Sequence, residues 1–103
     1  MPTQLIENQT SEAVLTVQPS DLASTMSLTK DDSSPEVFAT TKMIVLMELA
    51  AARMMNPLLQ KGELSVGIGV NIVHLAATTL GEEVKAVATF VKQEGKLYHF
   101  RVE

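Results

Sequence analysis

The stretch that most constrains the fold runs from residue 41 to residue 55, where TKMIVLMELAAARMM places apolar side chains in every direction around a helix. A helix that is hydrophobic on all sides is typical of a buried element. Glu48 lies near its middle, where an ionised carboxylate is unfavourable unless it is paired, hydrated within a site or partly protonated. The sequence therefore predicts a buried helix with one carboxylate that serves chemistry.

The ends of this helix carry ordinary signals. Thr40 or Thr41 is expected to act as its N-cap, because a threonine hydroxyl can accept a hydrogen bond from a free N–H of the first turn. Asn56 and Pro57, followed by Gly62, mark its end. The helix would make about four turns and measure roughly 22 Å.

Alternating and β-branched residues predict strands on both sides of the helix. A flexible tail over residues 1–12 is expected before the domain, which covers residues 13–103, and TKDDSSPE before the helix is a predicted loop. Gln93-Glu94-Gly95-Lys96 predicts a hairpin turn. The order of elements indicates an α+β domain, with one helix laid on a curled antiparallel sheet. The predicted strands cover residues 13–18, 22–28 (short), 64–75, 82–92 and 97–102.

Composition narrows the class of protein. The chain has 103 residues, which predicts one domain, and its net charge of -4 without a basic run argues against binding nucleic acid. It has no cysteine, which excludes disulfides and a thiol nucleophile and favours the cytoplasm. The apolar run at 43–52 is shorter than the ~20 residues that a membrane span needs. We expect a soluble, cytoplasmic protein without a membrane partner.

A single sheet cannot cover a helix that is apolar on all sides, and no second helix or sheet is predicted for the uncovered flank. We therefore expect a homodimer or a higher homo-oligomer.

Three polar residues lie among apolar neighbours: Thr40, Glu48 and His74. Glu48 could instead be neutralised by Lys42 or Arg53, or exposed, but those residues are six and five positions away and not at the three- or four-residue spacing that joins side chains on a helix. The functional interpretation is a nucleophile or a general base.

His74 and Thr40 each have a structural interpretation as well. His74 could be a hydrogen-bonded core histidine, although it ends the apolar stripe that begins at Val66 and could therefore share a layer with Glu48. Thr40 could simply cap the helix. Glu48, His74 and His99 show no metal-ligand spacing, so we predict no metal site, and His99 is expected to be exposed on its strand.

Three short motifs, taken together, resemble those of a known family. FAT at 38–40, ME at 47–48 and VHLAAT at 73–78, within a match over residues 14–103, resemble the hot-dog-fold thioesterases of the fluoroacetyl-CoA thioesterase-like family. The resemblance implies a hot-dog fold, homodimers with sites at the subunit interface, and hydrolysis of a small acyl-CoA thioester without a cofactor.

The resemblance also implies site residues. Thr40, Glu48 and His74 match the catalytic set, and Phe38 and Gly67 match substrate-binding positions. Glycine suits such a position because it allows the backbone to approach a ligand closely. Glu48 would attack the thioester or activate water, Thr40 and N–H groups near Gly67 would hold the oxyanion, and His74 would protonate the leaving sulfur or activate the deacylating water.

Helix geometry adds that Thr40 and Glu48 are about 12 Å apart along one helix. We therefore expect each site to combine Thr40 of one subunit with Glu48 of the other.

The sequence departs from the family in two places. Family members continue into a further strand with a T-H-x-R segment, which has no counterpart here after Arg101, so we expect the sheet to lack the family's last strand. The loop at 29–36 also lacks the phenylalanine-rich lid linked to fluoroacetyl selectivity, so that substrate is not predicted. The alternative function is a catalytically silent hot-dog dimer that binds an acyl-CoA or serves as an interaction module.

Overall fold

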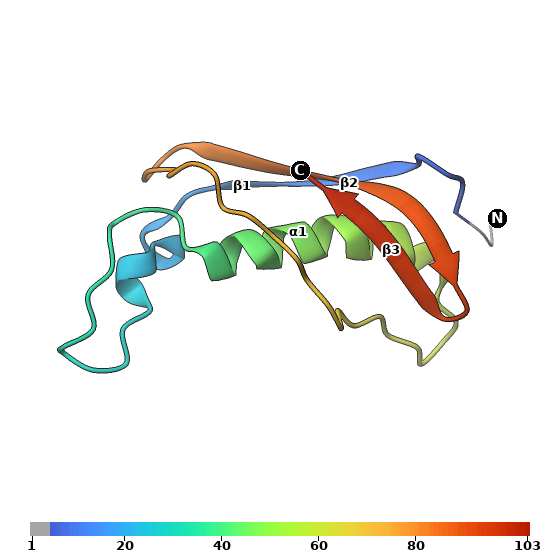
Figure 1. Cartoon of the computed structure of the whole chain (residues 1–103), viewed down its shortest axis with the longest axis horizontal. Helices are drawn as coiled ribbons and strands as arrows, with labels where there is room; N and C mark the ends of the chain where they lie inside the picture. The colour runs from blue at the N-terminus through green and yellow to red at the C-terminus, as the bar shows by residue number, and fades with distance from the viewer. Residues whose placement is uncertain (1–4) are drawn as a thin grey trace.

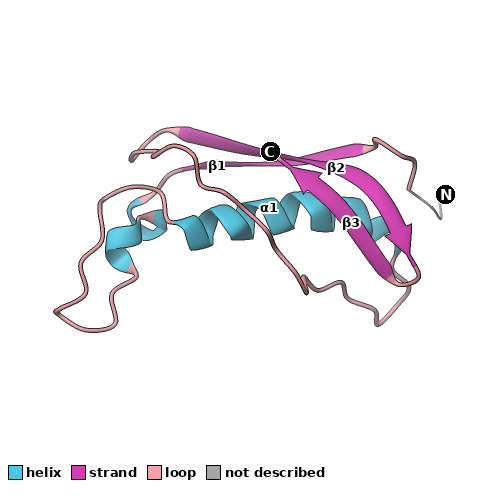
Figure 2. Ribbon diagram, viewed as in Figure 1, coloured by secondary structure: helices cyan, strands magenta, loops and turns pink. Residues whose placement is uncertain are grey.

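One α-helix, α1 (Thr40–Met55), lies against one face of a three-stranded antiparallel sheet in the computed structural model, which describes residues 5–103 (Figure 1). The strands stand side by side in the order β1 (Thr10–Thr16), β2 (Glu83–Glu94) and β3 (Leu97–Val102). This arrangement confirms the predicted α+β class. Short 3-10 helices occur at Pro19–Asp21, Ala23–Thr25 and Asn56–Leu58 (Figure 2).

The core forms where small residues of the sheet meet the helix. Ala13 of β1 is paired with Ala86 of β2, and both are at most 3% exposed, as is Ala50 of α1. Alanines on both surfaces let the helix approach the sheet closely and leave the core volume to a few larger side chains. Phe90 supplies much of that volume, and its ring centroid lies 5.9 Å from that of Phe100.

The helix is covered on one side only. Its buried residues, Leu46, Ala50 and Met54, recur at four-residue spacing and face the sheet. Val45 and Leu49 on the opposite side are 52% and 47% exposed. The single chain therefore has the uncovered flank that was expected from the sequence, because one sheet reaches only one face of the helix. An apolar flank is left open.

Two predicted strands in the N-terminal part differ from the structure: one begins earlier than predicted and the other is absent. β1 begins at Thr10, so residues 10–12 of the predicted tail pair with β2, and residues 1–4 of that tail lie outside the described residues. Residues 22–28 form no strand beyond one isolated bridge from Leu22 to Phe38. Local hydrogen bonds explain this, because the Thr25 hydroxyl donates to the Leu22 carbonyl at 2.7 Å and so favours a tight turn over an extended chain.

The segment that follows the helix is also not a strand in the single chain. Within the part of the chain that the structure describes, the backbone groups of residues 64–77 make no backbone hydrogen bond. The alternation predicted there is real in sequence, but Val66 and Ile68 are 79% and 75% exposed. A strand is defined by pairing with a neighbour, and the three strands of the sheet leave this segment without one. It crosses α1 as a long loop, yellow to orange in Figure 1.

The C-terminal hairpin follows the prediction. Glu94 pairs with Leu97, and the two-residue loop between them starts with Gly95 at a φ of 61°, a conformation that favours glycine. The C-terminal hairpin of the sheet was thus predicted correctly from the sequence. No helix within residues 5–103 has both the length and the apolar character required to cross a membrane.

Candidate active site

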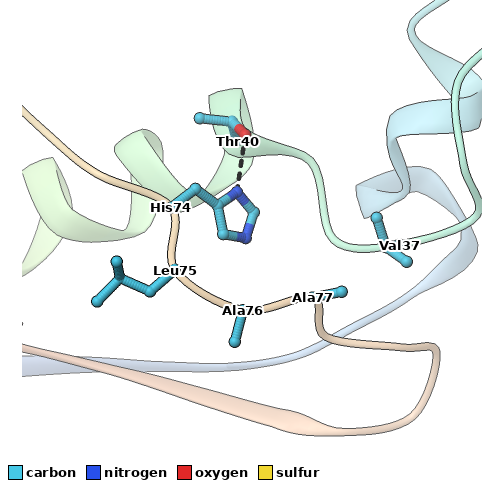
Figure 3. Close-up of a pocket in the computed structure, with 6 residues that line it drawn as sticks. All are labelled: Val37, Thr40, His74, Leu75, Ala76 and Ala77. Atoms are coloured by element: carbon cyan, nitrogen blue, oxygen red, sulfur yellow. Dashed lines mark hydrogen bonds between the residues drawn. The ribbon is translucent and has the colours of Figure 1, made fainter.

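A hydrogen bond joins the first residue of α1 to the crossing segment. Thr40 Oγ1 and His74 Nδ1 lie 2.8 Å apart, although 34 positions separate them in sequence (Figure 3). When the imidazole carries its proton on Nε2, the Thr40 hydroxyl donates to Nδ1. That arrangement leaves Nε2–H free to act on a bound molecule. Two of the three predicted catalytic residues are therefore in direct contact.

Backbone hydrogen bonds hold these two side chains in place. The Phe38 amide donates to the Thr78 carbonyl at 2.7 Å, and the Ala39 amide donates to the Asp21 carbonyl at 2.9 Å. The Phe38–Thr78 bond fixes the chain just before the helix beside the chain just after His74. Both partners of the Phe38–Thr78 bond lie within four residues of Thr40 or His74, so this bond holds the two side chains near each other, while the Ala39–Asp21 bond fixes the start of the helix against the chain around Asp21.

The predicted capping role of Thr40 or Thr41 is wrong. The N-cap of α1 is Ala39, whose backbone is extended, and no side chain caps the helix. Thr40 is the first helical residue, and its hydroxyl bonds to the imidazole instead of to a helix N–H. The structure therefore does not support a capping role for Thr40, and its contact with His74 makes it a candidate site residue.

Glu48 faces the other matched position on the crossing segment. A Cβ built on Gly67 would lie 3.1 Å from Glu48 Oε1, so the carboxylate packs directly against the glycine backbone. A Cβ at position 67 would require the carboxylate to move by a few tenths of an ångström, so glycine allows the closest approach. The structure therefore brings Glu48 and Gly67 together, in the same way that it brings Thr40 and His74 together.

The charge of Glu48 is not balanced by the helix cations. Lys42 is 3.9 Å from Asp21, and Arg53 donates to the backbone carbonyl of Glu12 at 2.9 Å. No ion pair or side-chain hydrogen bond to Glu48 occurs among residues 5–103. Glu48 is, however, exposed in the single chain, which corrects the prediction that it is buried. The carboxylate is thus free to meet a ligand or a second subunit.

The two pairs lie at different points of the helix. Thr40 and Glu48 are eight residues apart, which corresponds to about 12 Å along α1. The crossing segment runs alongside in the opposite direction, with Gly67 beside Glu48 and His74 beside Thr40. A single chain therefore assembles the predicted residues as two separate halves and does not bring all of them around one point.

Two neighbouring cavities flank the imidazole. An outer pocket of about 370 Å³ is open to solvent and is lined by Val37, Thr40, His74, Leu75, Ala76 and Ala77 (Figure 3). An inner cavity of about 420 Å³, which is only partly enclosed, lies between α1, the end of the crossing segment and the end of β3, and is also reached at His74. Phe38, a predicted substrate-binding residue, is 2% exposed and lines the inner cavity, and it also packs with Val17 and Leu22 in a small buried cluster.

The groups with clearly shifted pKa values lie outside both cavities. The Thr79 hydroxyl and amide donate to Glu82 and lower the pKa of that carboxyl group. Lys92, with His99 beside it, lowers the pKa of Glu94. His99 lies 3.4 Å from Glu94 on the exposed face of β3, as expected from the sequence. Across residues 5–103, no three histidine or acidic side chains gather closely enough to hold a metal ion.

Sequence reasoning overlooked the methionines of this region. Met43 and Met47 line the inner cavity from α1, but they were counted only as part of the apolar wrap of the helix. Their four-residue spacing, three residues before the buried positions Leu46 and Ala50, indicates a stripe at the edge of the core face. From that spacing, the sequence could have indicated that Met43 and Met47 lie together beside the core.

Comparison with known proteins points to one family. The model of the family described as fluoroacetyl-CoA-specific thioesterase, FlK, matches residues 17–103. A curated fluoroacetyl-CoA thioesterase from Streptantibioticus cattleyicolor is 44% identical over 68 residues, which make up 66% of this chain and 49% of the relative. The chain thus spans about half the length of this curated relative.

Solved structures of thioesterases are also similar to this chain. A mutant of the fluoroacetyl-CoA-specific thioesterase FlK, in complex with fluoroacetate and CoA, matches with a TM-score of 0.87 at 33% identity, over 95% of this chain and 80% of the other. A thioesterase superfamily member from Thermus thermophilus matches with a TM-score of 0.86 at 29% identity, over 96% and 70% of the two chains. A hot-dog-like protein from Thermanaerovibrio acidaminovorans, at 23% identity and a TM-score of 0.77, supports the hot-dog fold.

Proposed function

Because the chain belongs to the fluoroacetyl-CoA-specific thioesterase family, we propose that it hydrolyses a small acyl-CoA thioester to the free acid and CoA. The observation that carries this proposal is the 2.8 Å hydrogen bond between Thr40 and His74 at the mouth of a pocket. A hydroxyl and an imidazole in contact are suited to proton transfer and to stabilising charge on oxygen. The proposal requires no cofactor other than the CoA of the substrate, and it fits a cytoplasmic location.

The proposed roles follow the chemistry of thioester hydrolysis. Glu48 attacks the thioester carbonyl carbon or removes a proton from the attacking water, and the C–S bond then breaks. Thr40 and N–H groups near Gly67 stabilise the negative charge that develops on the carbonyl oxygen. His74 protonates the departing CoA sulfur and, if the acyl group has passed to Glu48, activates the water that releases it. Each role belongs to a group that is exposed or lines a pocket.

We further propose that two copies of the chain share each site. Thr40 with His74 forms one half and Glu48 with Gly67 the other, about 12 Å apart along the helix. An antiparallel second copy would place its Glu48 opposite the first copy's Thr40. The open flank of α1 and the exposed apolar residues of the crossing segment supply the surface for such a homodimer.

The direct test is turnover of a panel of acyl-CoAs, from acetyl to medium-chain and aromatic acyl groups, followed by release of the CoA thiol. We expect catalytic hydrolysis of at least one member, with loss of activity in the Thr40→Val variant because the hydroxyl that contacts His74 is removed. A chain that binds these thioesters but hydrolyses none of them would instead be a silent acyl-CoA-binding dimer.

Replacing Gly67 with alanine is expected to lower kcat by about tenfold while leaving the melting temperature almost unchanged. The added methyl group would lie 3.1 Å from Glu48 Oε1, so the carboxylate must move by a few tenths of an ångström. Small displacements of a reacting group cost large factors in rate, whereas an exposed, flexible side chain moves at little cost in stability.

The matched control is Gly69→Ala, two residues further along, where an added Cβ meets nothing within 4 Å. Steady-state kinetics and thermal unfolding of both variants decide the matter. Equal activity of the two variants would argue against a catalytic position for the Glu48 carboxylate.

A further inference from the structure

Within residues 5–103, Asp21 is the one charged residue that is buried, with 7% of its surface exposed. A buried carboxylate is stable only where its oxygen atoms have partners. Asp21 Oδ2 accepts a hydrogen bond from the Gln18 amide at 2.9 Å, and Oδ1 lies 3.9 Å from Lys42 Nζ. The carboxylate thus contacts both the turn that follows β1 and the first turn of α1.

The carboxylate of Asp21 closes a tight turn. The Gln18 amide donates to the Asp21 side chain, and the Asp21 amide donates to the Gln18 carbonyl at 2.8 Å, so the turn over residues 18–21 is closed from both ends. Aspartate stabilises such turns because its short side chain reaches a nearby backbone amide. The closed turn directs the Asp21 carbonyl to the Ala39 amide, which donates to it at 2.9 Å.

The chain just before α1 is held from two sides. Backbone hydrogen bonds of 2.8 and 2.9 Å join residues 21–23 to residues 37–39 around an isolated antiparallel bridge. On the other side, the middle residue of 37–39 donates its amide to the Thr78 carbonyl at 2.7 Å. Residues 37–39 thus lie between the chain around Asp21 and the chain that follows His74, and the next residue is Thr40.

The contact between Thr40 and His74 depends on this arrangement. It is a single side-chain hydrogen bond of 2.8 Å, and its two residues belong to segments that the backbone bonds align (Figure 3). Hydrogen bonds weaken steeply with distance and angle, so a displacement of about 1 Å at the helix start would break this one. Asp21 itself lines neither the outer pocket nor the inner cavity, and it therefore acts on the pair from a distance.

We propose that Asp21 is a positioning residue, whose carboxylate fixes the turn at 18–21 and thereby keeps the Thr40 hydroxyl in contact with His74. The hydrogen-bond acceptor is the operative part, because the ion pair is long and Lys42 is 37% exposed, which makes its contribution small. The effect on catalysis rests on the proposed function, whereas the effect on the contact can be measured without turnover.

The test uses ¹⁵N NMR of the full chain with labelled histidine rings, at about pH 8.5, where an imidazole is neutral. The sequence has two histidines, and His99 on β3 serves as the control in the same sample. The Nδ1 signal responds to a hydrogen bond whichever atom carries the shared proton. In Asp21→Ala, the His74 Nδ1 signal should move towards its position in Thr40→Val, while the His99 signals stay in place. An unchanged His74 signal would overturn the proposal.

Two further variants separate this role from a general loss of structure. Asp21→Asn keeps an acceptor for the Gln18 amide and should retain the wild-type His74 signal. Asp32→Ala removes a similar turn-closing carboxylate, which accepts backbone amides at 2.7 and 3.0 Å in the loop before α1, and should also leave that signal unchanged. A shift in Asp21→Asn or in Asp32→Ala as large as that in Asp21→Ala would contradict the proposed role.

Kinetics provide an independent readout. Asp21→Ala is expected to lower kcat by about tenfold, because a reacting group is displaced, with KM nearly unchanged. Combined with Thr40→Val, it should lower kcat no further, since the same contact cannot be lost twice. Additive losses would count against positioning through Thr40. If Asp21→Ala does not fold, Asp21→Ser, which keeps a shorter and weaker acceptor, takes its place in each comparison.

The two readouts also separate the two proposals. If the His74 signal responds to Asp21 as expected but no acyl-CoA is hydrolysed, the thioesterase proposal fails and the positioning of Thr40 against His74 stands. If acyl-CoA is hydrolysed but the His74 signal does not respond to Asp21→Ala, the positioning role fails and the thioesterase proposal stands.

Discussion

Replacing Glu48 with glutamine is expected to reduce kcat for acyl-CoA hydrolysis by about 10²- to 10⁴-fold, the usual contribution of a general base or of a similarly placed nucleophile. Glutamine has nearly the same shape but can neither attack the carbonyl carbon nor accept the proton. The fold should be unaffected, because the side chain is exposed and its carboxylate takes part in no ion pair within residues 5–103. KM should change little.

Glu83→Gln is the matched control, since Glu83 is an exposed glutamate at the start of β2. Equal rates for Glu48→Gln and Glu83→Gln would remove Glu48 from the mechanism. Single-turnover hydrolysis in ¹⁸O-labelled water separates its two roles in the wild-type protein. A nucleophile acquires the label in its own carboxylate, whereas a general base leaves the label in the released acid alone.

Mixing inactive subunits provides the second large effect. Thr40→Val and Glu48→Gln homodimers should each be nearly inactive, whereas a purified heterodimer of the two should recover about half of the wild-type activity. One of its two sites would combine an intact Thr40 and His74 from one subunit with an intact Glu48 from the other. The second site would carry both substitutions.

The contact between Thr40 and His74 supplies the control for this experiment. These residues are 2.8 Å apart within one chain, so they belong to the same half of the site. A heterodimer of Thr40→Val and His74→Gln subunits should therefore recover no activity, although each of these variants should complement Glu48→Gln. Complementation in all three combinations, or in none, would contradict a site shared in this way.

The sequence predicted the elements that depend on local pattern. The helix around Glu48 and the hairpin at Gly95 were predicted correctly, because helical length, flanking Asn56-Pro57 and a glycine in a two-residue turn act over a few residues. The α+β class followed from their order. The apolar surroundings of Thr40, Glu48 and His74 identified these three residues as candidates, whereas their joint catalytic roles and the choice of Phe38 and Gly67 came from the family resemblance.

What depends on distant partners could not be predicted from pattern. Alternating apolar residues at 64–75 indicate an extended chain but do not specify which neighbour it pairs with, so the predicted strand is absent from the single chain. In the same way, the apolar wrap of the helix does not reveal which face is covered, and Glu48 is exposed. The local sequence pattern predicted Thr40 as a helix cap. Only the three-dimensional position of His74 shows that the Thr40 hydroxyl has another partner.

The unpaired amides of residues 64–77 have a consequence for how the protein exchanges hydrogen with solvent. Amides that bond to no acceptor exchange at nearly the rate of an unfolded peptide, whereas the hydrogen-bonded amides of β2 and α1 exchange only when the structure opens. In an isolated chain this segment would therefore take up deuterium within seconds although the core beside it stays closed. If the proposed second chain covers this segment, its deuterium uptake should be slower in the assembled protein than in the isolated chain, and this difference can be measured without any substrate.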